Sequence, residues 1–211
     1  MPRRIGVTMR VDTHGAGHPE RRDALAQDWA TLLASALPDA AWLPVPNLGA
    51  LAVDFAERWA LDAVVLSGGD DLGTRPERDA TELALLAHCI AHGLPLLGVC
   101  RGLQLVQASC GGRVTRAHEM HHDGRSHVVR ASSSRGRALL GGEALHAASY
   151  HRHGVHEEDL ASSLEAFALA PDGLVEGLVH RSAPIAAVQW HPERPLPDPH
   201  VAIRLLRATL G

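Results

Sequence analysis

The sequence predicts an α/β fold in which helices flank a mostly parallel sheet. Short apolar runs rich in Val, Ile and Leu alternate with longer amphipathic stretches, a pattern typical of strands joined by crossover helices. A chain of 211 residues is long enough to bury about two-thirds or more of its unfolded surface in one core. No repeat, low-complexity tract or linker divides the sequence, so we expect a single domain over residues 1–211.

Each expected element rests on local periodicity and on the turn residues that bound it. Four apolar runs in the first half read as parallel strands: Ile5–Met9, Trp42–Pro46, Ala63–Ser67 and Pro95–Val99. Apolar residues at helical spacing predict three clear helices: Arg78–His92, Arg101–Ser109 and Pro199–Leu210. Between residues 127 and 189, Gly, Ser and Asp-Gly signals separate short strands, as in a more antiparallel region: His127–Ala131, Glu165–Ala170, Leu174–Val179 and Pro184–Gln189.

Charge and composition exclude several classes of partner. Lys plus Arg number 20 against 24 Asp plus Glu, and the net charge of −4 comes without a basic block, so no nucleic-acid partner is expected. The first residues turn polar too soon for a signal peptide, and no apolar run approaches a membrane span. Three cysteines suit a reducing compartment, so we expect a cytoplasmic protein with free thiols and no membrane partner.

The strongest candidate for chemistry is Cys100. An apolar strand leads into Gly98-Val99-Cys100-Arg101-Gly102 and a helix follows, which is the strand, turn and helix context of a nucleophile elbow. The flanking glycines permit a tight turn, and the start of a helix favours a thiolate. The alternative is an ordinary buried cysteine, which is how we interpret Cys89 and Cys110.

A histidine and a carboxylate near the other end of the chain are candidates for the supporting pair. The proline in His191-Pro192-Glu193 favours an extended backbone, in which residues two apart point to the same side. A carboxylate on one imidazole nitrogen leaves the other nitrogen free to accept a thiol proton, which predicts a Cys100, His191, Glu193 triad. Taken alone, the three residues also fit a surface turn after the last strand.

Fifteen histidines raise the question of a metal site. They cluster at residues 118–127 and 146–156, but there is no His-x-x-x-His on a predicted helix, no paired Cys-x-x-Cys and no carboxylate at a spacing typical of zinc or iron sites. We therefore expect no metal and no cofactor.

Together the elbow and the distal pair resemble the class I glutamine amidotransferase superfamily, in particular its γ-glutamyl hydrolase branch. The resemblance implies a flavodoxin-like three-layer sandwich whose central sheet is mostly parallel, with a more antiparallel C-terminal part. The run Val64–Asp71 is similar to the family's glycine loop, which implies an oxyanion hole formed by the amides of Gly69 and Arg101. A plain strand-terminating turn is the alternative for this loop.

Further residues match the family more weakly. Gln104 matches a glutamine that helps to hold the γ-glutamyl group, and Ser149 and His151 resemble a Ser-x-His that lines the same pocket. A solvated histidine-rich loop is the competing interpretation of Ser149 and His151. The segment Arg78–Glu82 resembles a family segment that opens a helix, where acidic residues suit the helix dipole.

The function implied is hydrolysis of a γ-glutamyl amide through a γ-glutamyl thioester, releasing glutamate and an amine-type product. The substrate is then a small molecule, and its leaving group stays open. Residues 10–25 look like those of small members resembling γ-glutamyl-CDP-amidate hydrolase, which would make the product a phosphoramidate nucleotide. Their charges either line the leaving-group side or, as we favour, form the solvated face of the first helix.

Other functions stay open beside this one. One is a glutaminase subunit that delivers ammonia to a separate synthetase partner. Another, from a different class, is a non-catalytic binding module on the same fold. A flavodoxin-like nucleotide binder is disfavoured because no Gly-x-Gly-x-x-Gly follows the first strand. A homodimer is also left open.

Overall fold

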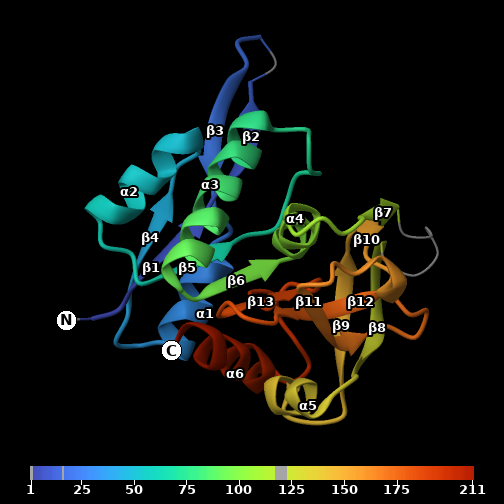
Figure 1. The fold of residues 1–211 in the computed structure, drawn as a ribbon. Coiled ribbons are helices and arrows are strands. Elements are labelled where there is room, and N and C mark those ends of the chain that lie inside the picture. Colours follow the sequence, from blue (N-terminus) through green and yellow to red (C-terminus); the bar gives the residue numbers. More distant parts are fainter. Residues whose placement is uncertain (1, 16, 117–122) are drawn as a thin grey trace.

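The computed structural model describes residues 2–15, 17–116 and 123–211, the side chains of residues 123–125 and 149 excepted. Its centre is a nine-stranded sheet whose strands come from both ends of the sequence (Figure 1). Across the sheet the order is β4 (Ala41–Val45), β1 (Arg4–Thr8), β5 (Ala63–Leu66), β6 (Leu96–Val99), β13 (Ile185–Val188), β12 (Val175–His180), β11 (Leu164–Leu169), β8 (Asp123–Ala131) and β9 (Ala144–Tyr150).

The sheet has a parallel half and an antiparallel half. Strands β4, β1, β5, β6 and β13 pair in parallel, whereas β12, β11, β8 and β9 pair antiparallel with their neighbours. All four residues of β5, β6 and β13 are buried, because helices cover both faces of the parallel half. The predicted parallel sheet with a more antiparallel C-terminal part is confirmed.

Helices form the two outer layers (Figure 1). Helices α1 (Asp28–Ala36), α5 (Ser134–Leu140) and α6 (Pro199–Leu210) contribute to one core, and α2 (Ala52–Arg58), α3 (Pro76–His92) and α4 (Arg101–Ser109) contribute to the other. The strands divide between these cores by alternation: in β5, Ala63 and Val65 belong to the first, while Val64 and Leu66 belong to the second. The three-layer arrangement follows from this period of two.

Helix ends follow the local signals of the sequence. Helix α6 begins where the Asp198 carboxylate accepts the backbone N–H of His200 at 2.9 Å, and Pro199 occupies its first turn. Helix α3 begins at Pro76, two residues before the predicted start, and ends at His92 because Gly93 adopts a left-handed conformation with φ 64°.

The N-terminal charged segment is a β-hairpin, so the favoured interpretation as a face of the first helix is wrong. Strands β2 (Arg10–His14) and β3 (Glu20–Ala24) pair antiparallel, with Arg10 opposite Ala24. The hairpin is tied to distant loops, since the Asp23 carboxylate accepts from Asn47 and Arg21 pairs with Glu77. Tertiary contacts therefore outweigh the local helix-forming character of residues 20–25.

Several shorter elements carry no clear periodic signal in the sequence. Besides α1, α2 and α5, they are the strands β7 (Thr115–Arg116) and β10 (His153–Gly154) and the 3-10 turns η1 (Gly49–Leu51) and η2 (Glu157–Asp159). Strand β9 was also missed, because its alternation of small residues with His146 is weakly apolar. Its pairing with β8 places residues 144–150 at the sheet edge, not in a solvated loop.

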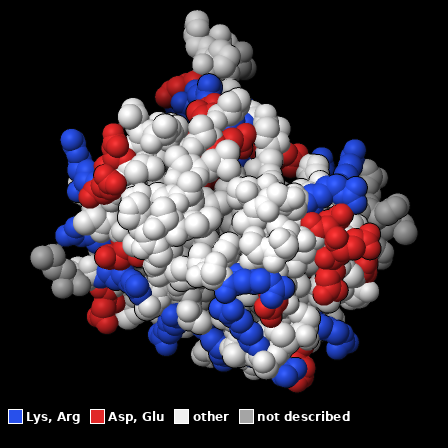
Figure 2. Space-filling view, in the orientation of Figure 1, with Lys and Arg blue, Asp and Glu red and all other residues white. Residues whose placement is uncertain are grey.

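Acidic and basic side chains are interspersed over the face shown in Figure 2. On this face the described residues do not gather into the basic stripe that nucleic-acid binding requires. Within the described ranges, no helix has both the length and the apolar character needed to cross a membrane.

Candidate active site

Cys100 lies at a sharp turn between β6 and α4. Its backbone has φ 53° and ψ −101°, a strained conformation for a residue with a side chain, and its N–H donates to the Val188 carbonyl at 2.7 Å. The strand and helix meet too closely for side chains at the neighbouring glycines: a Cβ on Gly98 would lie 2.8 Å from the Gly102 carbonyl carbon, and one on Gly102 would lie 2.6 Å from the Leu66 oxygen. The local geometry is therefore that of a nucleophile elbow.

His191 and Glu193 meet beside Cys100, as the His-Pro-Glu spacing predicts. The His191 Nδ1 lies 2.7 Å from the Glu193 Oε1, and all three side chains are buried. Burial opposes the imidazolium, but hydrogen bonds with Cys100 and Glu193 outweigh it and raise the pKa of His191 to about 9. The arrangement thus stabilises a protonated histidine next to a thiol.

Gln189 is a further neighbour of the thiol that the sequence argument did not single out. Its Nε2 donates to the Cys100 Sγ at 3.5 Å, and the side chain is buried. The signal was available, because Gln189 precedes His191 by two positions in an extended segment and so faces the same side.

The glycine loop after β5 is held by Arg78. This buried guanidinium donates to the carbonyls of Ser67 at 2.7 Å, Gly68 at 3.0 Å and Gly69 at 3.0 Å. Gly69 has φ 92°, which favours glycine. The Gly68 C=O and the Gly69 N–H belong to the same trans peptide, in which the two groups point in opposite directions. Because the Gly68 C=O faces Arg78, the Gly69 N–H points away from Arg78.

Buried charges link this loop to the elbow. The Glu82 carboxylate accepts from Arg78 Nε at 3.0 Å and from Thr8 Oγ1 at 2.7 Å, and it also pairs with Arg101. Arg101 forms a second ion pair with Asp79. The segment Arg78–Glu82 is thus structural, as expected, but through these ion pairs rather than through the helix dipole alone.

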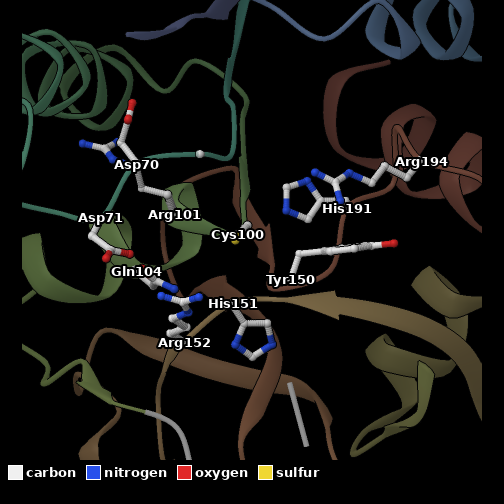
Figure 3. Close-up of a pocket in the computed structure, with 11 residues that line it drawn as sticks. Asp70, Asp71, Cys100, Arg101, Gln104, Tyr150, His151, Arg152, His191 and Arg194 are labelled. Atoms are coloured by element: carbon white, nitrogen blue, oxygen red, sulfur yellow. The ribbon is translucent and has the colours of Figure 1, made fainter. Parts of the chain in front are cut away.

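A cavity of about 360 Å³ opens above Cys100 (Figure 3). Its lining is mostly polar and charged, and it consists of Gly69, Asp70, Asp71, Cys100, Arg101, Gln104, Tyr150, His151, Arg152, His191 and Arg194. Six of the eight predicted site residues line this cavity. Glu193, the seventh, lies behind the wall in contact with His191. The side chain of Ser149, the eighth, lies outside the described residues, although its backbone belongs to β9.

Gln104 and His151 are both buried beside the cavity and both contact the same carbonyl. Gln104 Nε2 donates to the His153 oxygen at 3.0 Å, and the His151 Nδ1 lies 2.9 Å from that oxygen. Since a carbonyl can only accept, the His151 Nδ1 carries a proton. The predicted binding residues are therefore held in fixed orientations.

A fully buried carboxylate behind the cavity was missed by the sequence argument. Glu176 Oε1 lies 3.2 Å from the His127 Nε2 and 3.6 Å from the His151 Nε2. Burial favours the neutral acid, but the neighbouring imidazoles of His127 and His151 outweigh it and lower the pKa of Glu176. A lone Glu in an apolar strand is the signal, because such a residue needs a buried partner.

Within the described ranges, the remaining cysteines and histidines do not form a second reactive or metal-binding site. Cys89 is buried in α3, where desolvation raises the pKa of its thiol to about 12. No group of three or more His, Cys, Asp or Glu side chains there is placed to hold a metal ion. His118, His121 and His122 of the first histidine cluster lie outside the described residues.

Comparison with known proteins identifies the family. The family model described as Peptidase C26 matches residues 5–193, so the chain belongs to the Peptidase C26 family, within the class I glutamine amidotransferase-like proteins. The family and the hydrolase relative described below support hydrolase activity on amide bonds.

Individual relatives support the same assignment. The γ-glutamyl-CDP-amidate hydrolase of Campylobacter jejuni is 29% identical over 197 residues, which cover 90% of each chain. A Mycobacterium tuberculosis relative with a glutamine amidotransferase name is 32% identical over 178 residues, or 72% of this chain and 57% of that protein's length. A glutamine amidotransferase structure from Thermotoga maritima covers 99% of this chain and 82% of its own, with a TM-score of 0.67 at 14% identity. The structural likeness confirms the predicted flavodoxin-like fold.

Proposed function

We propose that this protein hydrolyses γ-glutamyl amides by nucleophilic catalysis at Cys100. The observation that carries the proposal is the strained elbow at Cys100 with its thiol hydrogen-bonded to a His191 that Glu193 orients. A thiolate beside an imidazolium is the reactive pair of cysteine acyl-transfer enzymes. The C. jejuni relative, which is named for a γ-glutamyl amide substrate, supports the choice of acyl group.

In the proposed reaction, the Cys100 thiolate attacks the γ-carbonyl carbon of the substrate. The N–H groups of Gly69 and Arg101 donate to the resulting oxyanion. The hydrogen bond from Arg78 to the Gly68 carbonyl supports this orientation of the Gly69 amide. As the intermediate collapses, the C–N bond breaks and His191 gives its proton to the leaving nitrogen. The product is a γ-glutamyl thioester on Cys100.

Water completes the cycle. His191, now neutral, removes a proton from water, which attacks the thioester carbon and releases glutamate while the sulfur leaves as thiolate. The Glu193 carboxylate fixes the ring orientation and stabilises the imidazolium in both half-reactions. Gln104 and His151 line the space that we assign to the glutamyl group.

The test is glutamate release by the purified protein alone. The substrate panel comprises glutamine, γ-glutamyl-4-aminobutyrate, a neutral γ-glutamyl alkylamide and a γ-glutamyl phosphoramidate nucleotide. We expect turnover of substituted amides that is lost in Cys100→Ala and retained in Cys110→Ala, a matched change at a cysteine outside the cavity. Mass spectrometry of quenched reactions should detect a γ-glutamyl adduct on the Cys100 peptide.

Three outcomes would contradict the proposal. Turnover that persists in Cys100→Ala would remove the nucleophile assignment. Cleavage confined to glutamine would favour a glutaminase that supplies a separate synthetase. Absence of any cleavage by a folded protein would favour a binding module.

A further inference from the structure

One side of the cavity carries an arginine stacked on an aromatic ring. The Arg194 guanidinium carbon lies 4.0 Å from the centroid of the Tyr150 ring, a cation-π contact. The same ring meets His191 edge-on, with the two centroids 6.0 Å apart. Tyr150 is 48% exposed, so this side of the cavity is open to an incoming molecule.

The position of Arg194 is fixed by the backbone as well as by the ring. Its N–H donates to the His191 carbonyl at 3.2 Å, which ties the arginine to the histidine of the candidate triad through a tight turn. Tyr150 comes from the end of β9, more than forty positions earlier in the chain. The tertiary fold therefore brings a preorganised guanidinium to the histidine.

Arg194 differs in its ionic surroundings from Arg101 and Asp70, two other charged residues of the cavity. Arg101 is paired with Glu82 and Asp79, and the Asp70 carboxylate is paired with Arg78 at 3.1 Å. By contrast, no described carboxylate lies within ion-pair distance of the Arg194 guanidinium. Its planar set of N–H donors matches carboxylate and phosphoryl oxygens.

The side of the cavity on which Arg194 lies identifies what it would meet. Figure 3 shows Tyr150, His191 and Arg194 on one side of Cys100, whereas the opposite side carries Asp70, Asp71, Arg101 and Gln104. Under the proposed function, His191 protonates the leaving nitrogen, so the leaving group must extend toward the His191 side. The glutamyl part is then left to the side of Gln104.

We propose that Arg194, held against Tyr150, is a specificity residue that selects leaving groups bearing an anionic oxygen group. This inference rests on the proposed γ-glutamyl hydrolase function and adds the chemical class of the departing amine. The shared chemistry is a carboxylate or phosphoryl group a few bonds from the scissile nitrogen. A hydrogen bond to a charged group contributes roughly ten- to a hundredfold in discrimination.

The experiment compares kcat/KM for three γ-glutamyl amides with equal acyl groups. The leaving groups are 4-aminobutyrate, which ends in a carboxylate, a cytidine phosphoramidate, which carries phosphoryl groups, and butylamine, which is neutral. The variants are Arg194→Gln, which removes the charge, Arg194→Lys, which keeps it without the planar fork, and Tyr150→Leu, which removes the ring. Arg181→Gln, an exposed arginine paired with Glu165 outside the cavity, is the matched control.

We expect Arg194→Gln to lower the ratio of anionic to neutral kcat/KM by about ten- to a hundredfold. Arg194→Lys and Tyr150→Leu should lower it by smaller factors, and Arg181→Gln should leave it unchanged. A loss concentrated on one anionic substrate names the carboxylate or the phosphoryl group as the natural ligand. An unchanged ratio in Arg194→Gln, or an equal fall on all three substrates, would overturn the specificity role. Failure of the proposed function is distinct, because the neutral amide would then show no Cys100-dependent turnover in the wild type.

Discussion

Substitution of Gly68 tests whether activity requires the present position of the His191 ring. An ideal Cβ built on Gly68 would lie 2.5 Å from the His191 Cε1 and 3.3 Å from each ring nitrogen. Gly68 does not have a positive φ, so its backbone accepts alanine without strain. Gly68→Ala therefore changes one thing: it requires the imidazole to move by about 1 Å, a displacement that typically costs about a hundredfold in rate.

The shift would act on both partners of the ring. It would lengthen the 2.7 Å contact between His191 and Glu193 and disturb the hydrogen bond to Cys100. We expect kcat to fall about a hundredfold on every γ-glutamyl substrate. The free energy of unfolding should change by less than about 1 kcal/mol, because the added methyl group meets a side chain next to an open cavity rather than the packed core.

The assay pairs steady-state kinetics with urea denaturation of the same preparation. Gly142→Ala is the control, because no atom lies within 4 Å of its ideal Cβ and its φ is not positive. A folded Gly68→Ala protein with the wild-type rate would refute the reasoning, since the ring would then not need its present position. A rate loss that merely follows unfolding would refute it as well.

Three further predictions concern charge. The raised pKa of His191 contributes folding stability that is fully present below about pH 6.5 and is lost as pH rises through about 9. With the same pKa, the imidazolium that protonates the leaving nitrogen is depleted above about pH 9. The kcat/KM profile should therefore fall above about pH 9, and Glu193→Gln should move this basic limb to lower pH; an unmoved limb would contradict the assignment. Glu82→Gln should lower the free energy of unfolding in urea by about 3 kcal/mol, because it removes the fully buried anion that Arg78 and Arg101 share and leaves each with one partly exposed carboxylate, whereas the exposed Glu57→Gln should change it little. The lowered pKa of Glu176 contributes stability above about pH 4.5 that is lost as pH falls through its folded-state value, so Glu176→Gln should flatten the acid limb of a stability profile, and an unaltered limb would count against an ionised Glu176.

Local sequence patterns predicted the parts of the fold that depend on short-range periodicity. The parallel strands β1, β5 and β6 and the helices α3, α4 and α6 lie within two residues of the predicted ranges, because apolar alternation and helix-end residues act over one or two turns. The shorter helices and the edge strand β9 were missed. Their apolar stripes are short, and packing against the sheet stabilises them more than their own propensity does.

The candidate triad was also predictable from the sequence, because each of its parts carries a local signal. The glycines around Cys100 are required by the contact of strand and helix, and the proline between His191 and Glu193 favours the extended backbone in which they meet. Sequence spacing alone could not show that these two distant segments face each other.

The sequence by itself thus determined the α/β class, the elbow and the His-Glu pair. Only the tertiary structure decided which buried ions support the glycine loop, that the N-terminal charges form a hairpin, and that Arg194 rests on Tyr150 beside His191. The physical reason is the separation along the chain over which each kind of interaction acts. Periodicity and turn chemistry act between near neighbours in the chain, whereas an ion pair or a ring contact depends on the strand order that brings remote segments together.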